Sequence, residues 1–228
     1  MVSIVTINYN NSKGLKKTLE SITKLNFEHE LIIVDGDSND NSLAVVTGYN
    51  NKISNIKLIS EKDKGVYDAM NKGIKNAKGD WVIFMNSGDC FYETDDMAQI
   101  LEDHSTYDLL YGNTRMEGKI FHPKNLKALE HGIIHACHQS MFFNFKKLSD
   151  ELRYINFYKI YADYELVNRL YLKNFKFKYI DRCISEIEPG GISQSVSWRK
   201  RIDKFLIVIN SNGLIRGVIK AYLKKKNV

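Results

Sequence analysis

The fold class of this chain is decided by Leu31-Ile32-Ile33-Val34-Asp35-Gly36-Asp37-Ser38. The first four residues form an uninterrupted apolar run, which is typical of a strand buried on both faces of a parallel sheet. Acidic and turn-forming residues follow the run directly. The sequence therefore predicts that this strand ends at Asp35.

Strand and helix signals alternate on either side of this strand. Short apolar runs at 3–7, 56–59 and 81–85 alternate with segments of helical spacing at 14–25, 39–49 and 66–77. Repeated strand–helix–strand units predict an α/β fold, with a mostly parallel sheet and helices on both sides. The second half is less regular. It contains strand-like runs at 109–113, 119–121 and 175–184, another apolar run at 138–145, and helical patterns at 161–172, 205–209 and 214–220.

Polar residues gather where the first four predicted strands end. They form the clusters 8–10, 35–38, 60–63 and 86–89. Ligands of open α/β sheets bind beyond the carboxyl ends of the strands. The sequence therefore predicts that all four clusters line one rim.

Asp89 is the candidate metal ligand of this rim. It follows Gly88, which lets the backbone approach a ligand closely. Hard divalent ions are often held by one or two carboxylates together with phosphate oxygens. The alternative is a turn in which Asp89 caps the next helix.

Three further rim residues are candidate ligand contacts. Asp35 stands where it can accept a hydrogen bond from a nucleotide base, although helix capping within 35–40 is the stronger interpretation of that motif alone. Asp68 and Asn71 share one face of the helix over 66–77. Both are poorer helix formers than Glu or Lys, which favours a ligand contact over a solvated face.

Asp163 is the candidate general base. It lies at the start of the helix over 161–172, where a carboxylate is stabilised as the anion. A base for a sugar hydroxyl must be ionised and within hydrogen-bond reach. A role limited to the helix dipole is the alternative. His138-Gln139 and Gly190-Gly191-Ile192-Ser193 are weaker signals.

Composition limits the class of protein. The 228 residues, 43% of them hydrophobic, suffice for one compact domain with a sizeable core. Cys90, Cys137 and Cys183 are too far apart for a C-x-x-C zinc or disulfide pattern, which favours free thiols in a reducing compartment. The N-terminus reads as a strand rather than a signal peptide, and the sequence has no apolar run of 18 residues, so we expect a cytoplasmic protein.

The positive charge is concentrated in the last 33 residues. Residues 196–228 carry nine Lys or Arg against one acid, Asp203, whereas the whole chain has a net charge of +6. The body therefore offers no basic groove for nucleic acid. Apolar residues interleave with these cations, which suits helices on an anionic membrane surface. Packing on the domain or in a homodimer remains the alternative, and the sequence leaves the oligomeric state open.

Taken in order, these motifs resemble the family 2 glycosyltransferases, especially the branch that builds O-antigen and capsular polysaccharide. The resemblance covers roughly residues 1–195. It is carried by Val5-Thr6-Ile7-Asn8-Tyr9-Asn10, Val34-Asp35-Gly36-Asp37-Ser38-Asn39-Asp40, Asp63-Lys64-Gly65-Val66-Tyr67-Asp68-Ala69-Met70-Asn71-Lys72-Gly73, Ala77-Lys78-Gly79-Asp80, Phe84-Met85-Asn86-Ser87-Gly88-Asp89, Cys137-His138-Gln139-Ser140, Ala162-Asp163-Tyr164-Glu165 and Gly190-Gly191-Ile192-Ser193.

The resemblance implies a GT-A domain over 1–195, with a Rossmann-like sheet. The composition beyond it predicts a basic helical extension over 196–228. It implies inverting transfer from a UDP- or GDP-sugar, with Mn²⁺ or Mg²⁺ held by Asp89 and with Asp163 as the base. The acceptor it implies is a lipid-linked oligosaccharide of surface polysaccharide or lipopolysaccharide, at the inner face of the cell membrane. The donor contacts are then Thr6, Asn8, Tyr9, Asp35, Asp63, Asp68, Asn71, Asn86 and Ser87, and the acceptor contacts are His138, Gln139 and Glu165.

Two departures from the family pattern matter. The usual D-x-D is replaced by Asn86-Ser87-Gly88-Asp89, which leaves one metal carboxylate, and the usual paired acids after the second strand are replaced by Asp35-Gly36. One rival class is a nucleotidyltransferase, but it favours a Gly-rich basic loop where this chain has Asn8-Tyr9-Asn10-Asn11. The other rival, a non-catalytic sugar-nucleotide or membrane-binding module, predicts donor binding without turnover.

Overall fold

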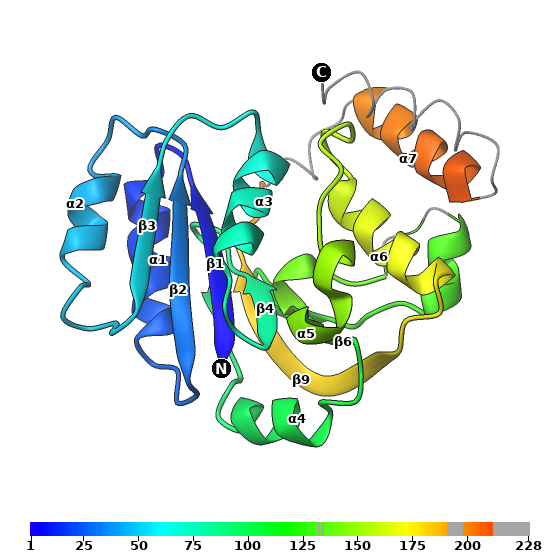
Figure 1. Ribbon diagram of the computed structural model, residues 1–228, viewed down its shortest axis with the longest axis horizontal. Helices are drawn as coiled ribbons and strands as arrows, with labels where there is room; N and C mark the ends of the chain where they lie inside the picture. The colour runs from blue at the N-terminus through cyan, green and yellow to red at the C-terminus, as the bar shows by residue number, and fades with distance from the viewer. Residues whose placement is uncertain (132, 134, 191–197, 212–228) are drawn as a thin grey trace.

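The computed structural model describes residues 1–131, 133, 135–190 and 198–211, in which one mixed sheet carries helices on both faces (Figure 1). Its strand order is β3-β2-β1-β4-β8-β6-β9-β5, and β7 pairs with β6. The strands are β1 (Val2–Asn8), β2 (His29–Asp35), β3 (Ile56–Ser60), β4 (Trp81–Phe84), β5 (Cys90–Phe91), β6 (Leu109–Met116), β7 (Lys119–Phe121), β8 (Met141–Asn144) and β9 (Phe177–Ile187). The α-helices are α1 (Ser12–Ile22), α2 (Ser42–Thr47), α3 (Val66–Asn76), α4 (Met97–Asp103), α5 (Phe145–Leu148), α6 (Ala162–Leu172) and α7 (Trp198–Ser211).

The first four strands form the parallel sheet that the sequence predicts. β1 pairs with β2 and with β4 in parallel, and β2 pairs in parallel with β3. Alternate residues of β1 enter two separate cores, because successive side chains of a strand point to opposite faces. Val5 packs in the core with α3 and α6, and Ile4 packs in the core with α1, α2 and α4.

Helix α3 lies directly on β1 because Gly73 has no side chain. A Cβ at this position would stand 2.3 Å from Cγ1 of Val5. The close approach brings the start of α3 to the carboxyl end of β1, where the polar rim is predicted.

The second half of the sheet is mixed, so the parallel pattern does not extend through it. β8 is antiparallel to both β4 and β6, whereas the long, curved β9 is parallel to β6 (Figure 1). In the described part of the sheet, the ladder between β4 and β8 consists of two residue pairs, Trp81 with Asn144 and Val82 with Phe143. Helix α6 covers the same face of the sheet as α3.

Some helix boundaries differ from the expected ones. α1 begins earlier because the side chain of Asn11 caps it by accepting a hydrogen bond from the N–H of Gly14. α2 is shorter than 39–49 because Asp40 instead accepts hydrogen bonds from the N–H groups of Ser12 and Ser42. The expected helix at 205–209 lies within α7, and 214–220 lies outside the described residues. No helix in the described part of the chain is both long and apolar enough to span a membrane.

Candidate active site

Two adjoining cavities open at the carboxyl ends of β1 and β4. One, of about 430 Å³, is lined by Asp89, His138, Gln139 and Asp163, among others. The other, of about 790 Å³, is lined by residues that include Asn8, Tyr9 and Asp63. Asn86 and Ser87 line both cavities. We call the first the reaction cavity and the second the donor cavity.

Asp89 is a buried carboxylate at the edge of the reaction cavity, 8% exposed. One oxygen accepts a hydrogen bond from Nε2 of Gln139 at 2.8 Å, and the other accepts one from the N–H of Glu188 at 3.2 Å. Burial raises the pKa of Asp89 although both hydrogen bonds oppose this. The fold therefore keeps a carboxylate where its charge is costly, as sites that bind ligands commonly do.

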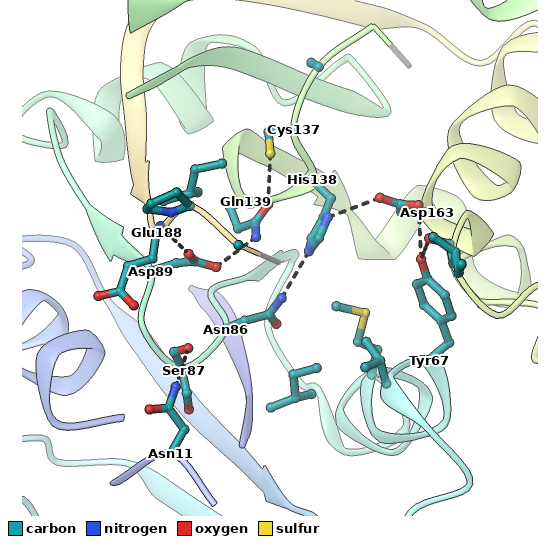
Figure 2. A pocket seen from close by; sticks show the side chains of 18 of the residues that line it. Asn11, Tyr67, Asn86, Ser87, Asp89, Cys137, His138, Gln139, Asp163 and Glu188 are labelled. Carbon is teal, nitrogen blue, oxygen red and sulfur yellow. Dashed lines mark hydrogen bonds and ion pairs between the residues drawn. The ribbon is translucent and has the colours of Figure 1, made fainter. Parts of the chain in front are cut away.

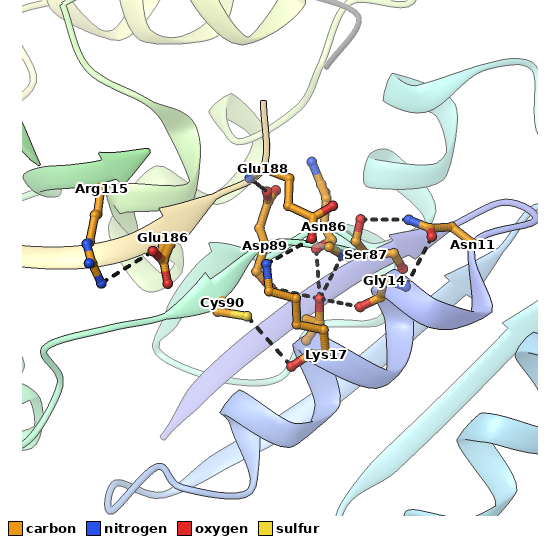
Figure 3. A network of polar contacts seen from close by, with 12 residues as sticks. Asn11, Gly14, Lys17, Asn86, Ser87, Asp89, Cys90, Arg115, Glu186 and Glu188 are labelled. Atoms are coloured by element: carbon orange, nitrogen blue, oxygen red, sulfur yellow. Dashed lines mark hydrogen bonds and ion pairs between the residues drawn. The ribbon is translucent and has the colours of Figure 1, made fainter. Parts of the chain in front are cut away.

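Helix α1 holds the loop that carries Asp89 (Figure 3). The Thr18 hydroxyl donates to the carbonyl of Asp89 at 2.7 Å and accepts from the N–H of Gly88 at 3.0 Å. Asn11 donates to the carbonyl of Ser87 at 3.1 Å. The loop conformation is thus fixed by a helix rather than by the loop itself.

Asp163 lies across the reaction cavity from Asp89 (Figure 2). Its Oδ1 accepts a hydrogen bond from the N–H of Tyr164 at 2.8 Å and lies 3.2 Å from the hydroxyl of Tyr67. Its Oδ2 lies 3.4 Å from Nδ1 of His138. The carboxylate is therefore held at the start of α6 with lone pairs of Oδ2 still free for a substrate proton.

The segment Cys137–Ser140 connects the two carboxylates. Gln139 donates a hydrogen bond to Asp89, and Nδ1 of His138 lies beside Asp163. Nε2 of His138 lies 3.3 Å from the amide nitrogen of Asn86. The fully buried Ser140 anchors the segment, because its hydroxyl bonds those of Thr114 and Ser185. One turn thus sets the positions of both carboxylates.

The donor cavity is built on Asn8 and Tyr9 at the end of β1. Tyr9 is 68% exposed, so its ring can contact a ligand at the cavity wall. The amide of Asn8 donates to Oδ1 of Asp35 at 2.8 Å and to Ser42 at 2.8 Å, while its own Oδ1 is buried without a hydrogen-bond partner. Asp63 joins this wall and is paired with Lys72.

Known proteins match this chain along most of its length. The family model Glycosyl transferase family 2 matches residues 3–161. The chain belongs to this family. A PGL/p-HBAD biosynthesis glycosyltransferase of Mycobacterium bovis is 29% identical over 205 residues, which cover 86% of this chain and 80% of that protein. An uncharacterized glycosyltransferase of Mycobacterium tuberculosis is 32% identical over 181 residues, 74% of this chain and 68% of that one.

Solved structures show the same fold at low sequence identity. TarS residues 1–349 of S. aureus, in complex with UDP-GlcNAc, matches with a TM-score of 0.75 and 19% identity, covering 91% of this chain and 65% of that one. The mannosyltransferase PcManGT of Pyrobaculum calidifontis, in complex with GDP-Man and Mn²⁺, matches with a TM-score of 0.67 and 15% identity, covering 92% and 64%. The chain spans less than two thirds of both. These matches confirm the GT-A fold of this family 2 glycosyltransferase.

Five of the site residues that the sequence predicts do not line either cavity. Thr6 is fully buried on the α1 side of β1. The side-chain amide of Asn71 is bonded to the backbone of Tyr154, donating to its carbonyl and accepting from its N–H. The remaining three are Asp35, Asp68 and Glu165, of which Asp68 accepts from the N–H of Lys64 and Glu165 pairs with Arg169 on the far side of α6.

Asp35 lies beneath the donor cavity. Burial by itself would raise its pKa, but hydrogen bonds from Ser38, Asn8 and Ser60 outweigh burial and hold the pKa below its ordinary value. The carboxylate therefore stays ionised and holds Asn8 and Ser38 in place. In this structure it is 1% exposed, so its observed contacts are to the protein.

Sequence reasoning missed several residues that shape the site. Tyr67 and Glu188 line the reaction cavity, and so does Lys159, its one Lys or Arg among the described residues. Thr18 could have been identified from the sequence, because it is a polar residue on the otherwise apolar face of α1. Lys159 lies in an irregular segment, where no periodicity marks it.

The residues around Asp89 suit a hard cation bound together with a diphosphate. In the described part of the chain, no three His, Cys, Asp or Glu side chains gather as a metal site. However, Oδ1 of Asn86 and Oγ of Ser87 are buried oxygens that bond no other part of the described chain, and both residues line the reaction cavity. Oxygen ligands of this kind, completed by phosphate oxygens, are what Mg²⁺ accepts.

His135 is a buried histidine that should make this glycosyltransferase sensitive to acid. It is 2% exposed, its ring nitrogens have no hydrogen-bond partner among the described residues, and burial lowers its pKa to about 4. Its folded-state pKa lies below the unfolded one, so its contribution to stability is full above about pH 6.5 and is lost as pH falls towards 4. Protonation of His135 should lower the free energy of unfolding of the wild type by roughly 2 kcal/mol between pH 7 and 5. His135→Leu should lack this part of the pH dependence.

Urea unfolding at several pH values measures this effect. The matched control is His104→Leu, which replaces a half-buried histidine at the end of α4. Parallel pH profiles for the wild type and His135→Leu would contradict the prediction.

Proposed function

We propose that this chain transfers a sugar, with inversion, from a nucleoside diphosphate sugar to a hydroxyl of a saccharide acceptor. The observation that carries this proposal is the placement of Asp89 and Asp163 on opposite sides of one cavity that adjoins a second, larger one. Such a pair separates the two tasks of the reaction, which are to stabilise the leaving group and to deprotonate the acceptor.

The donor cavity suits the nucleoside. The exposed ring of Tyr9 offers a stacking surface for a base, and the unpartnered Oδ1 of Asn8 offers a hydrogen-bond acceptor. Neither feature discriminates uracil from guanine, so UDP- and GDP-sugars are both candidates. We propose Asp63 as a further contact at this wall. Asp35, Asp68 and Asn71 act through the residues that they hold, whereas the Thr6 hydroxyl is buried in β1 and bonds no described residue.

The diphosphate is proposed to lie where the two cavities join, at Asn86 and Ser87. A Mn²⁺ or Mg²⁺ ion would be held there by Asp89, with the neighbouring oxygens of Asn86 and Ser87. The ion supplies Lewis-acid stabilisation of the departing diphosphate. Lys159 adds a positive side chain on the same cavity wall.

Asp163 is proposed as the general base. The acceptor hydroxyl loses its proton to Oδ2 while its oxygen attacks the anomeric carbon, and the bond to the diphosphate breaks. One displacement from the face opposite the leaving group inverts the anomeric configuration. Gln139 and His138 border the space left for the acceptor, whereas Glu165 lies away from it.

We also propose a lipid-linked acceptor and a membrane contact, which would place the enzyme in O-antigen, capsular or lipopolysaccharide synthesis at the inner face of the membrane. Residues 1–195 then carry the chemistry and 196–228 the membrane contact. Trp198, Ile202 and Phe205 share one exposed face of α7, beside the exposed Arg201 and Lys204. Exposed aromatic residues with flanking cations are typical of helices at an anionic membrane surface.

The opposite side of α7 is fixed to the catalytic domain. The buried Asp203 accepts hydrogen bonds from the N–H groups of Lys159 and Ile160, a few residues before Asp163. A membrane under α7 would therefore be held at a set distance from the reaction cavity.

Replacing the two aromatic residues of this face tests the membrane contact. Burial of each ring stabilises the bound state by roughly 1.5–3 kcal/mol, so Trp198→Ser/Phe205→Ser should weaken binding to phosphatidylglycerol vesicles at least tenfold in flotation assays. Phe121→Ser, on the exposed strand β7, is the control and should leave binding unchanged. Equal flotation of both variants would remove the membrane proposal, and loss of a dimer in light scattering would assign this face to a second copy.

Donor binding tests the function itself. Titration calorimetry with UDP-GlcNAc, UDP-glucose, UDP-galactose and GDP-mannose, each with Mn²⁺ and then with EDTA, should show metal-dependent binding of one nucleotide class. Nucleotide release from that donor then separates an enzyme from a binding module. Pyrophosphate formation from UTP or GTP and a sugar phosphate would indicate the nucleotidyltransferase alternative.

A further inference from the structure

His138 occupies the space between the two halves of the reaction cavity. Its side chain is 16% exposed, and both ring nitrogens face protein groups. Nδ1 lies 3.4 Å from Oδ2 of Asp163, and Nε2 lies 3.3 Å from the amide nitrogen of Asn86 (Figure 2). The imidazole therefore joins the start of α6 to the loop after β4.

We propose that His138 is a positioning residue for the general base, rather than an acceptor contact. This inference rests on the proposed role of Asp163. The amide nitrogen of Asn86 is a donor, so Nε2 of His138 accepts from it and the proton of the neutral ring lies on Nδ1, facing Oδ2 of Asp163. The contact fixes Oδ2, because the N–H of Tyr164 donates to Oδ1 and the hydroxyl of Tyr67 also lies beside Oδ1.

The hydroxyl of Tyr67 does not replace this contact. It lies 2.5 Å from the carbonyl of Ile160 and 3.2 Å from Oδ1 of Asp163, so its single hydrogen points mainly at the carbonyl. Without His138, the carboxylate could turn about its side-chain bonds until Oδ2 no longer faced the acceptor. Misplacement of a reacting group by about 1 Å lowers rates by roughly 10²-fold.

The backbone around His138 is fixed well enough for this role. Ser140 is fully buried and its hydroxyl lies 2.9 Å from the carbonyl of Asn113 on β6 and 2.6 Å from the hydroxyl of Ser185 on β9. Gln139 is held by Asp89. The same short turn therefore ties the position of the base to the position of the carboxylate that faces the diphosphate.

Two substitutions separate positioning from mere packing. His138→Leu removes the donor and keeps an apolar side chain of similar size, whereas His138→Asn retains an N–H group near the position of Nδ1. We expect nucleotide release from UDP-GlcNAc or GDP-mannose, whichever the chain turns over, to fall about 10²-fold in kcat for His138→Leu and to recover largely in His138→Asn. The donor Kd should stay within about threefold in both, since the ring does not line the donor cavity.

An NMR measurement tests the contact without turnover. The ¹⁵N shifts of the His138 ring, assigned by their loss in His138→Leu, should show a protonated Nδ1 in the wild type and a change of tautomer in Asp163→Ala. A wild-type ring protonated on Nε2 alone would overturn the proposal. Equal kcat values in the wild type and His138→Leu would also overturn it, as would equal losses in the Leu and Asn variants. Absence of turnover in the wild type would contradict the proposed function instead, and the NMR result would still decide this inference.

Discussion

Asp163→Asn should lower turnover by roughly 10²–10⁴-fold, the usual contribution of a group that transfers a proton in the transition state. The substitution keeps the size of the side chain and an oxygen that can accept from the N–H of Tyr164. What it removes is the basic lone pair that takes the acceptor proton. Because Asp163 does not line the donor cavity, the donor Kd should change by less than about threefold.

Steady-state kinetics combined with donor calorimetry separates these two effects. Asp103→Asn, at the exposed end of α4, is the control and should behave as the wild type. Equal losses of turnover and donor binding in Asp163→Asn would count against its role as a base. A wild-type rate in this variant would remove Asp163 from the mechanism.

Asp89→Ala should abolish most of the metal-dependent activity. A bound cation contributes several kcal/mol to stabilising the departing diphosphate, which corresponds to a loss of about 10²-fold or more in kcat/KM. Donor binding in the presence of Mn²⁺ should fall towards the value measured in EDTA. Calorimetric titration of the donor at several fixed Mn²⁺ concentrations measures the change.

The stability of the same variants shows whether Asp89 serves structure or function. Burial raises the pKa of Asp89, so the ionised form is disfavoured in the folded protein, and Asp89→Asn should not lower the free energy of unfolding appreciably. Asp95→Ala, in an exposed position on the next loop, is the control for activity. Unchanged metal dependence in Asp89→Ala would overturn the assignment.

The parallel half of the fold could be predicted from the sequence because burial on both faces leaves an unmistakable pattern. The run 31–34 is fully buried in β2, and the four polar clusters after the strands meet at one end of the sheet. In the mixed half, the runs at 109–113, 119–121 and 175–184 predicted the strands β6, β7 and β9, but not how these strands pair. β8 and β5 are four and two residues long, too short for a period to be read, and their partners are distant in sequence.

In the candidate site, too, some features could be predicted from the sequence and others could not. Asp89 lies in the loop after β4 and Asp163 lies in the first turn of α6, so their positions could be inferred. The distance between them depends on the turn at Cys137–Ser140 and on side-chain networks that no local pattern encodes. Asn71 illustrates the limit. Its place on the polar face of α3 suggested a ligand contact, but its amide is paired with the backbone of Tyr154, which approaches from a part of the chain 83 residues away.

The seam between β4 and β8 is short, yet the two halves of the sheet cannot diversify independently. β4 and β8 pair at Trp81 with Asn144 and at Val82 with Phe143, but α3 of the parallel half and α6 of the mixed half share one apolar core. Substitutions on the two sides of this core are therefore coupled, because a change of volume in a packed core is felt by its neighbours. Recombination between relatives at this seam should lower stability unless the core residues of both halves come from the same parent.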